Sequence, residues 1–300
     1  MRIVITGASS FIGMELTDFL LAQGHHIIAV CRPESKSSLP NGIEVVTLKM
    51  NEYRNLHRFI THADIFVNLA WAGTNHGGRN LGNVQKTNIS STIIAMIEAK
   101  KMGCKVFVES GSQAEYGTIL GDISENTPCS PFSEYGKAKL EVKNRLFEFS
   151  ERLGIKYIHL RIFSLYGEND HPWTLVMTCV DKMLRNEPIA LTSCTQNWNF
   201  LYVKDAVKQI SSLWEYAITD QNFQHEVFNI ASKDTRVLKD FIEEIHRLTR
   251  SSSSLNYGAI MPSNIVSLKP DTSKTESAIG FISEFTFEDV VNRIIKKYKS

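Results

Sequence analysis

Short apolar runs alternate with longer amphipathic stretches through the first half of the chain. The runs have the length and composition of buried strands, and the stretches between them carry apolar residues at the spacing of a helix face. This alternation predicts an α/β fold with a doubly wound parallel sheet, whose ligands lie beyond the carboxyl ends of its strands. The expected strands are Ile3–Thr6, Ile27–Cys31, Glu44–Leu48, Ile65–Ala70, Lys105–Ser110 and Tyr157–Phe163, and the expected helices are Phe11–Gln23, Glu52–Thr61, Val84–Met102 and Ser133–Leu153.

A glycine-containing turn directly follows the first expected strand. The segment TGASSFIG, residues 6–13, ends the apolar run, and a helical pattern then continues to Gly24. A strand, a glycine turn and a helix in this order direct backbone N–H groups and a helix N-terminus at one spot, which suits the pyrophosphate of a dinucleotide. Ser10 replaces the middle glycine of the G-x-x-G-x-x-G pattern, between Gly7 and Gly13, and its hydroxyl can donate to a phosphate.

The end of the second expected strand bears on the choice of dinucleotide. An acidic residue there would bond the ribose of NAD, but the chain has Arg32. Arg32, with Ser35 or Lys36, has the chemistry to hold the additional phosphate of NADP, so NADP is the preferred cofactor. NAD is the alternative, with Glu34 on the ribose and Arg32 in solvent.

Tyr135 and Lys139, in the segment SEYGKAK, form the only Tyr-x3-Lys pair of the chain. Residues four apart on a helix share a face, so the ammonium can lie beside the phenol. A positive charge there favours the phenolate and allows proton exchange with a substrate alcohol or carbonyl near neutrality. The residues expected against the dinucleotide are Gly7, Ser9, Ser10, Phe11, Ile12, Gly13, Arg32, Ser35, Leu69, Ala70, Trp71, Ser110, Tyr135, Lys139 and Ile162.

The second half of the chain has a looser pattern. After Phe163, loops rich in Ser, Asn and Pro separate short helical stretches, and one further strand is expected near Val227–Ile230. We therefore expect a dinucleotide-binding Rossmann domain over residues 1–163, to which residues 200–232 return. Residues 164–199 and 233–300 are expected to form a smaller mixed C-terminal domain that binds the substrate.

The composition argues against several classes of protein. A formal net charge of +1 gives no bulk attraction to nucleic acid or to anionic membranes, and no apolar stretch reaches the length of a membrane span. Five widely spaced cysteines without a C-x-x-C motif indicate reduced thiols rather than a zinc site or disulfides, and the nine histidines are scattered. We expect a cytoplasmic enzyme without a bound metal.

Several motifs together resemble those of the extended short-chain dehydrogenases/reductases, in particular the NAD-dependent epimerase/dehydratase family. Besides TGASSFIG and SEYGKAK, the resemblance rests on SGSQAEYG, LRIFSLYG (residues 160–167), NFLYVKDAV (199–207), VFNIAS (227–232) and the segment 271–291. It covers nearly the whole chain and implies a nucleotide-sugar substrate. By this resemblance Ser112 bonds the reacting oxygen, Tyr135 is the acid/base, Lys139 holds the ribose hydroxyls, and Asn88 helps to hold the lysine or a water relay. The resemblance is also compatible with a homodimer.

The family reduces, oxidises, epimerises and dehydrates sugars, so the reaction needs a separate argument. Dehydratases of the family carry an Asp-Glu pair where this chain has Gln113 and Ala114, which argues against dehydration. The preference for NADP favours net reduction, and the chain looks most similar to 4-ketoreductases that complete deoxysugars, of the CDP-abequose and dTDP-6-deoxyhexose types. The alternatives are an epimerase with bound NAD and a noncatalytic NADP-sensing protein.

Substrate contacts are predicted mainly from position along the chain. Many relatives have an arginine where this chain has Trp198, whose ring suits a base or ribose but is equally well explained by core packing. The predicted substrate-binding residues are Ser112, Gln113, Tyr135, Trp198, Asn199 and Tyr202, and the further pocket candidates are Trp71, Glu115, His171, Trp173 and Arg185.

Overall fold

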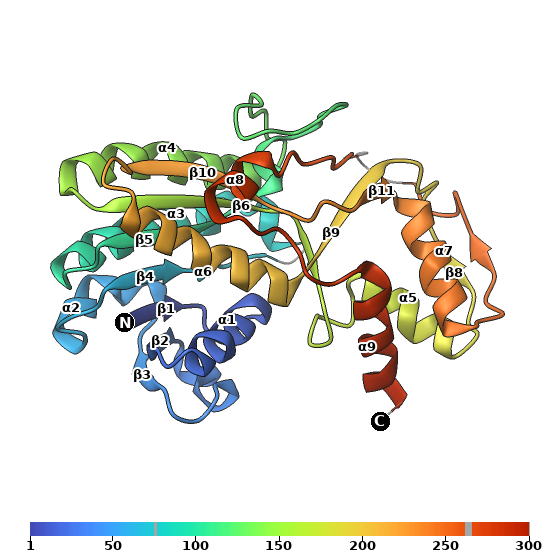
Figure 1. Ribbon diagram of the computed structural model, residues 1–300, viewed down its shortest axis with the longest axis horizontal. Coiled ribbons are helices and arrows are strands. Elements are labelled where there is room, and N and C mark those ends of the chain that lie inside the picture. Colours follow the sequence, from blue (N-terminus) through green and yellow to red (C-terminus); the bar gives the residue numbers. More distant parts are fainter. Residues whose placement is uncertain (75–76, 262–265, 300) are drawn as a thin grey trace.

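A parallel sheet forms the larger part of the molecule (Figure 1). The computed structural model describes residues 1–74, 77–261 and 266–299, and the side chains of residues 36–38 lie outside this description. The seven strands follow the order β10-β6-β5-β4-β1-β2-β3, and neighbouring strands pair in parallel, which confirms the doubly wound fold. The strands are β1 (Arg2–Thr6), β2 (His26–Cys31), β3 (Glu44–Thr47), β4 (Ile65–Asn68), β5 (Val106–Ser112), β6 (Lys156–Ile162) and β10 (His225–Ile230).

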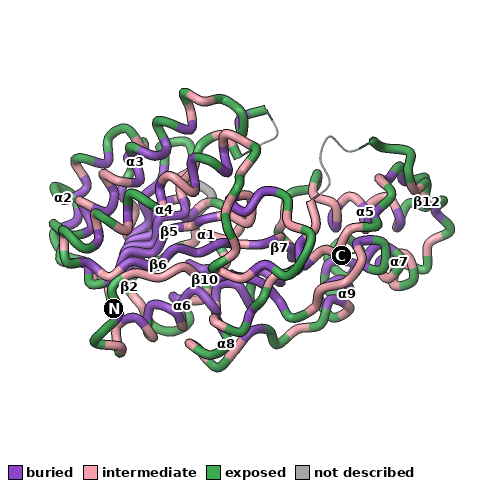
Figure 2. Tube along the Cα trace, turned by 90° about the horizontal axis from the view of Figure 1, so that it is seen from above, coloured by how far each residue is buried: buried purple, intermediate pink, exposed green. Residues whose placement is uncertain are grey.

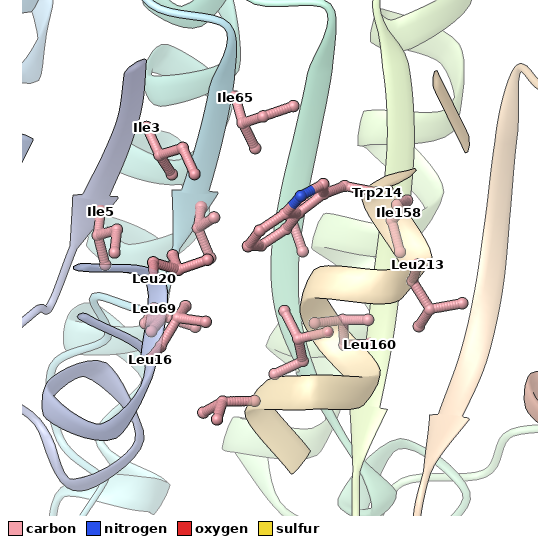
Figure 3. Packing of buried hydrophobic residues seen from close by; sticks show 14 of the residues in the cluster. Ile3, Ile5, Leu16, Leu20, Ile65, Leu69, Ile158, Leu160, Leu213 and Trp214 are labelled. Carbon is pink, nitrogen blue, oxygen red and sulfur yellow. The ribbon is translucent and has the colours of Figure 1, made fainter. Parts of the chain in front are cut away.

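Helices cover both faces of this sheet, which explains why its strands are mostly apolar on both faces instead of alternating. One face packs against α1 (Phe11–Ala22) and α6 (Val203–Thr219), and the other against α3 (Gly82–Lys101) and α4 (Glu134–Leu153). Figure 3 shows Leu213 and Trp214 of α6 among the sheet residues of the first core. In Figure 2 the central strands form the continuous buried region of the larger part.

The segment after β3 differs from the expectation. A continuous helix over Glu52–Thr61 was predicted, but the structure has a 3-10 helix η2 (Met50–Asn55) and a single-turn helix α2 (Leu56–Phe59). Two carboxylates bond the N-terminal ends of the two helices. At η2, Glu52 accepts from the backbone N–H of Lys49 at 2.8 Å, and at α2, Glu98 of α3 accepts from the backbone N–H of His57 at 3.1 Å. The prediction of one helix was therefore wrong because a tertiary contact divides it.

The smaller part contains a three-stranded sheet of β7 (Ser164–Tyr166), β9 (Asn197–Tyr202) and β11 (Thr235–Val237), and a two-stranded pair of β8 (Ile189–Ala190) and β12 (Leu255–Asn256). Helices α5 (Leu175–Leu184), α7 (Leu238–Thr249) and α9 (Phe287–Lys299) share a core with it. After β9, α6 and β10 return the chain to the large sheet. Helix α8 (Ser273–Ile279) also packs there, against α6 and β10, although residues 233–300 were expected in the smaller part.

The described residues contain no helix long and apolar enough for a bilayer span, and no cluster of three or more His, Cys, Asp or Glu side chains suited to a metal ion.

A buried carboxylate, Glu115, ties the end of β5 to β6. It lies in the short helix η4 (Gln113–Glu115), is fully buried, and accepts from Arg161 Nε at 3.0 Å and from the backbone N–H of Ser112 at 2.8 Å. His159 Nε2 lies 2.9 Å from the same carboxylate. Burial lowers the pKa of His159, so its neutral ring donates through Nε2 while Nδ1 accepts from the Tyr157 hydroxyl at 2.8 Å.

The charge of Glu115 is therefore balanced chiefly by Arg161. Burial by itself would raise the pKa of Glu115, but these donors outweigh burial and hold that pKa well below its usual range. A carboxyl whose pKa is lower in the folded chain than in the unfolded chain stabilises the fold. For Glu115, this contribution is present at pH values above its unfolded pKa of 4.5. This contribution is lost as the pH falls below that value towards the folded pKa.

We expect Glu115→Gln to lower the free energy of unfolding at pH 7 by about 3 kcal/mol, because it leaves the buried Arg161 guanidinium without its counter-charge. Urea unfolding at several pH values measures the effect, and the difference from the wild type should shrink below about pH 4.5. The control is Glu141→Gln, which removes a half-exposed partner of Arg145 and should cost less than about 1 kcal/mol. Equal losses in both variants, or a pH-independent loss, would contradict this account.

Candidate active site

A cavity of about 540 Å³ lies at the carboxyl ends of β1, β2 and β4. Eight of the residues predicted against the dinucleotide line it: Gly7, Ser9, Ser10, Arg32, Ser35, Leu69, Ala70 and Trp71. As far as the described residues define it, the lining does not include Phe11, Ile12, Gly13, Ser110, Tyr135, Lys139 or Ile162. The parallel sheet therefore brings the ends of β1, β2 and β4 to one cavity, as expected for the carboxyl edge of such a sheet.

The glycine turn has the close packing that a dinucleotide cradle requires. Gly7 has φ +69°, and a Cβ there would lie 2.8 Å from the backbone nitrogen of Ala70. A Cβ at Gly13 would lie 2.3 Å from the Gly7 carbonyl oxygen, so the first turn of α1 can approach β1 only with glycine. Ser10 is the N-cap of α1, and its Oγ accepts from the Gly13 N–H at 3.1 Å. Its hydroxyl proton remains available to a phosphate, and the residues present fit a pyrophosphate.

The rim of the cavity holds the residues that bear on NADP and NAD. Arg32 and Ser35 both line the cavity, while Glu34 pairs with Arg32 at 3.6 Å. The side chains of Arg32 and Glu34 are 66% and 60% exposed, so this ion pair is weak and can yield to a ligand phosphate. The side chain of Lys36 lies outside the described part of the chain.

Trp71 connects the cavity to the Tyr-Lys pair. Its indole lines the cavity, its ring lies edge-on to the Tyr135 ring with centroids 6.0 Å apart, and Lys139 Nζ lies 3.5 Å from its ring centroid. Tyr135 stands in the first turn of α4, where the Ser133 side chain caps the helix by accepting from the Gly136 N–H. Tyr135 and Lys139 are 9% and 1% exposed. The predicted pair is thus brought together on one helix face, directly behind the cavity wall.

A second cation lies close to the phenol. The guanidinium carbon of Arg79, in the short helix η3 (Gly78–Asn80), is 4.9 Å from the Tyr135 ring centroid, whereas Lys139 Nζ is 6.0 Å from it. Arg79 is exposed, and its Nε donates to the Thr74 carbonyl. The sequence reasoning missed this residue because nothing in its loop resembles a motif.

The ammonium of Lys139 is held by the end of β5. It donates to the Ser110 carbonyl oxygen, lies 3.3 Å from Glu109 Oε1, and is 3.5 Å from Ser110 Oγ. Glu109 was not predicted, and it is fully buried. A glutamate inside the apolar run VFVES was the available signal, because a carboxylate in a buried strand requires a partner.

Glu109 belongs to a row of polar side chains that crosses the sheet. Thr6, Asn68, Glu109 and His159 are register partners on β1, β4, β5 and β6. Asn68 donates to Glu109 Oε2 at 2.6 Å, and its Oδ1 accepts from the Thr6 hydroxyl at 2.7 Å. Burial raises the pKa of Glu109 above its ordinary value, and the charge of Lys139 limits that rise.

Asn88 has a different set of contacts from the one expected. It was predicted to hold the lysine or a water relay, but its amide donates to the Ala72 carbonyl at 2.9 Å and accepts from the Ala72 N–H at 3.0 Å. It also donates to Gln85, whose Oε1 accepts from the Trp71 indole at 2.9 Å. Asn88 therefore anchors the loop that carries Trp71, while Glu109 and Ser110 hold the lysine. The water relay stays a prediction.

Ser112 and Gln113 lie next to the start of α4. A Cβ on Gly136 would lie 2.4 Å from the Ala114 carbonyl oxygen, so the first turn of α4 packs tightly on η4. This contact holds η4 against the start of α4, and both Ser112 and Gln113 are half-buried. Their roles toward the substrate stay predictions. Glu115, in contrast, points into the core and not into the cavity.

The residues predicted from β9 are less well suited to the substrate. Asn199 is fully buried, and its amide group bonds Ser232, Asp234 and Thr235, so it joins β9 to the start of β11 and the residues before it. A contact with a sugar diphosphate does not fit this geometry. Tyr202 donates to Glu168 at 3.0 Å and lines a separate cavity of about 280 Å³. The indole N–H of Trp198 is buried without a hydrogen-bond partner among the described residues, and its predicted substrate role stays open.

The remaining pocket candidates lie at the surface. His171 lines the large cavity and stacks on Trp173, with ring centroids 4.4 Å apart and Trp173 72% exposed. Both were expected near the sugar, but His171 instead reaches the dinucleotide side. Arg185 is exposed and pairs with Asp181 and Glu187, as expected of a solvated helix end.

Comparison with known proteins agrees with this geometry. Residues 3–231 match the NAD dependent epimerase/dehydratase family. The chain is 30% identical over 258 residues to the dTDP-6-deoxy-L-talose 4-dehydrogenase (NAD(+)) of Aggregatibacter actinomycetemcomitans, covering 81% of this chain and 89% of the relative. It is 25% identical over 305 residues to the CDP-abequose synthase of Salmonella muenchen, covering 98% and 97%.

Solved structures show the same fold. The UDP-glucose 4-epimerase of Thermotoga maritima, determined with UDP-glucose, superposes with a TM-score of 0.89 at 21% identity, covering 100% of this chain and 99% of the other. The dTDP-glucose 4,6-dehydratase of Bacillus anthracis, in complex with NAD, gives 0.85 at 19% identity and covers 100% and 96%. Because the family match spans most of the chain, the protein is an enzyme that belongs to the NAD dependent epimerase/dehydratase family.

Proposed function

We propose that this enzyme uses NADPH to reduce the 4-keto group of a nucleotide-activated 6-deoxyhexose, with Tyr135 as the proton donor. The observation that carries the proposal is the position of Trp71, which lines the dinucleotide-sized cavity and contacts both Tyr135 and Lys139. The proton donor is therefore next to the cavity that fits the cofactor. The relatives named above as a 4-dehydrogenase and a CDP-abequose synthase, both for deoxysugars, support the substrate class.

The chemistry requires a hydride at C4 and a proton at the ketone oxygen. When bound, the reduced nicotinamide supplies the hydride. Tyr135 gives its hydroxyl proton to the oxygen as the carbonyl becomes an alcohol, and Ser112 orients that oxygen by hydrogen bonding. Lys139, held by Glu109 and Ser110, places a positive charge beside the resulting phenolate.

Dehydration is disfavoured by the residues near Ser112. Gln113 and Ala114 carry no acid, and the carboxylate of η4 belongs to Glu115, which is fully buried and bonded to His159 and Arg161. Among the described residues of η4, none can remove a proton from a sugar in the cleft and then protonate its departing hydroxyl.

The cofactor preference rests on Arg32 and Ser35, which line the cavity. A guanidinium and a hydroxyl suit a phosphate at the adenosine ribose. NAD is favoured instead by the Glu34 carboxylate next to Arg32 and by the NAD(+) in the name of the Aggregatibacter relative. An epimerase with tightly held NAD is therefore the second candidate. It is distinguished by NAD that stays with the purified protein and by turnover without added reductant.

A homodimer and a cytoplasmic location stay predictions.

We expect Tyr135→Phe to lower kcat at least 100-fold while NADPH binds within about twofold of the wild type, because the change removes the transferable proton and little contact area. The assay follows NADPH consumption with CDP-, dTDP-, UDP- and GDP-linked 4-keto-6-deoxysugars. Tyr298→Phe, at a partly exposed ring near the C-terminus, is the matched control. Full activity of the Tyr135 variant would remove Tyr135 from the reaction, and turnover without reductant would favour the epimerase.

Arg32→Asp should change the ratio of the NADPH and NADH dissociation constants in favour of NADH, by roughly ten- to a hundredfold, because a charged hydrogen bond to the phosphate is replaced by repulsion. Calorimetric titration of each reduced dinucleotide measures this without a substrate. Arg58→Asp is the control for the change in net charge, since Arg58 is exposed on α2. An unchanged ratio in the Arg32 variant would remove Arg32 from the cofactor site.

A further inference from the structure

The buried carboxylate of Glu109 is not required by the reaction described above. A buried charge is costly unless it is paired. Glu109 is nevertheless fully buried, with Asn68 Nδ2 2.6 Å from one carboxylate oxygen and Lys139 Nζ 3.3 Å from the other. Among the residues that the structure describes, its one cationic hydrogen-bond partner is thus the lysine of the Tyr-Lys pair.

We infer that Glu109 is a positioning residue that fixes Lys139 and, by its charge, sets the pH at which Tyr135 ionises. The inference rests on the proposed role of Tyr135 and deepens it. With Glu109 ionised, the Glu109–Lys139 pair is neutral and favours the phenolate little. With Glu109 neutral, the pair carries one positive charge beside the phenol and favours the phenolate more strongly.

The geometry makes this coupling direct. Lys139 has three N–H groups, and its described acceptors are Glu109 and the carbonyl and hydroxyl of Ser110. These acceptors hold the ammonium at the end of β5, over the face of the Trp71 ring. Its position relative to the Tyr135 hydroxyl is therefore fixed by β5. Burial raises the pKa of Glu109 to about 7, so its charge changes near neutrality.

Other charged and titratable groups surround Glu109. Lys139 faces it from α4, Asn68 from β4, and Tyr157 and His159 lie on β6, where His159 is its register partner. Glu115 of η4 raises the pKa of Glu109, and Glu109 in turn raises that of Tyr53 in η2. Arg79 is the further cation that faces Tyr135. Of the side chains in the described part of the chain, only Lys139 both contacts Glu109 and lies on the helix face of Tyr135, so we expect the effect of Glu109 to pass through it.

The test measures the ionisation of Tyr135 directly, without a substrate. Phenolate absorbance near 295 nm is titrated in the wild type and in each variant, and the same titration in the corresponding Tyr135→Phe background is subtracted. Glu109→Gln should move the midpoint of the difference to lower pH by about one unit, because the isosteric amide leaves the lysine charge uncompensated. Glu109→Asp should move it less, since the carboxylate is retained at a greater distance.

Glu98→Gln is the matched control. Glu98 is also a buried carboxylate paired with a lysine, Lys101 at 2.6 Å, but it lies ten residues beyond Asn88 on α3, about 15 Å along the helix. Its variant should leave the Tyr135 midpoint unchanged. An unchanged or raised midpoint in Glu109→Gln, or an equal shift in Glu98→Gln, would overturn the inference. If Glu109→Gln does not fold, as judged by circular dichroism, Glu109→Asp decides by the same criterion.

The outcome is distinguishable from failure of the proposed function. If none of the 4-keto sugars is reduced but the Tyr135 midpoint responds to Glu109, the coupling stands and the substrate assignment fails. If NADPH-dependent turnover is found and requires Tyr135, but the Tyr135 midpoint is the same in Glu109→Gln and the wild type, the function stands and the coupling is overturned.

Discussion

Two carboxylates buried beneath the carboxyl edge of the sheet determine how the active site is built. Glu109 and Glu115 are both fully buried, and each would destabilise the fold without partners. Asn68 and Lys139 compensate the first, and His159 and Arg161 compensate the second. These partners come from β4, α4 and β6. The hydrogen bonds that compensate the two charges therefore also fix the positions of those elements relative to β5. The lysine and serine of the proposed reaction are thereby held by the core.

Trp71 divides this polar interior from the cofactor cavity. Its indole N–H donates to Gln85, and the backbone of the next residue, Ala72, is hydrogen-bonded to Asn88. These bonds hold the ring with the Lys139 ammonium over its face. Lys139 Nζ donates to the Ser110 carbonyl, lies 3.3 Å from Glu109 Oε1, and has its longest contact, 3.5 Å, to Ser110 Oγ. The N–H of the long contact is the one most easily redirected to a ligand. Contact with a ribose can therefore coexist with the Glu109 pair.

The sequence predicted the layers well because they depend on local patterns. Apolar runs located the strands of the large sheet to within a few residues, and the predicted glycine turn lines the large cavity. What it missed depends on tertiary contacts. The break between η2 and α2 requires Glu98 from a distant helix, and the role of Asn199 as a link to residues 232–235 is invisible in a motif. Glu109 was readable in principle as a charge inside an apolar strand, but its partner could not be inferred from spacing.

The exposure of the cofactor rim bears on the choice between reduction and epimerisation. A reductase must release the oxidised dinucleotide and bind a reduced one in every turnover, whereas an epimerase regenerates its own cofactor and benefits from retaining it. Arg32 and Glu34 are 66% and 60% exposed, and contacts at such positions contribute little and are screened by salt. An adenosine phosphate bound at this rim would therefore add contacts that are screened by salt. The polar contacts that are rigid and buried lie around Lys139 instead, at the reacting end, where precise placement of the proton donor matters in each cycle. Such an arrangement suits the proposed reductase, which must exchange its cofactor in each turnover.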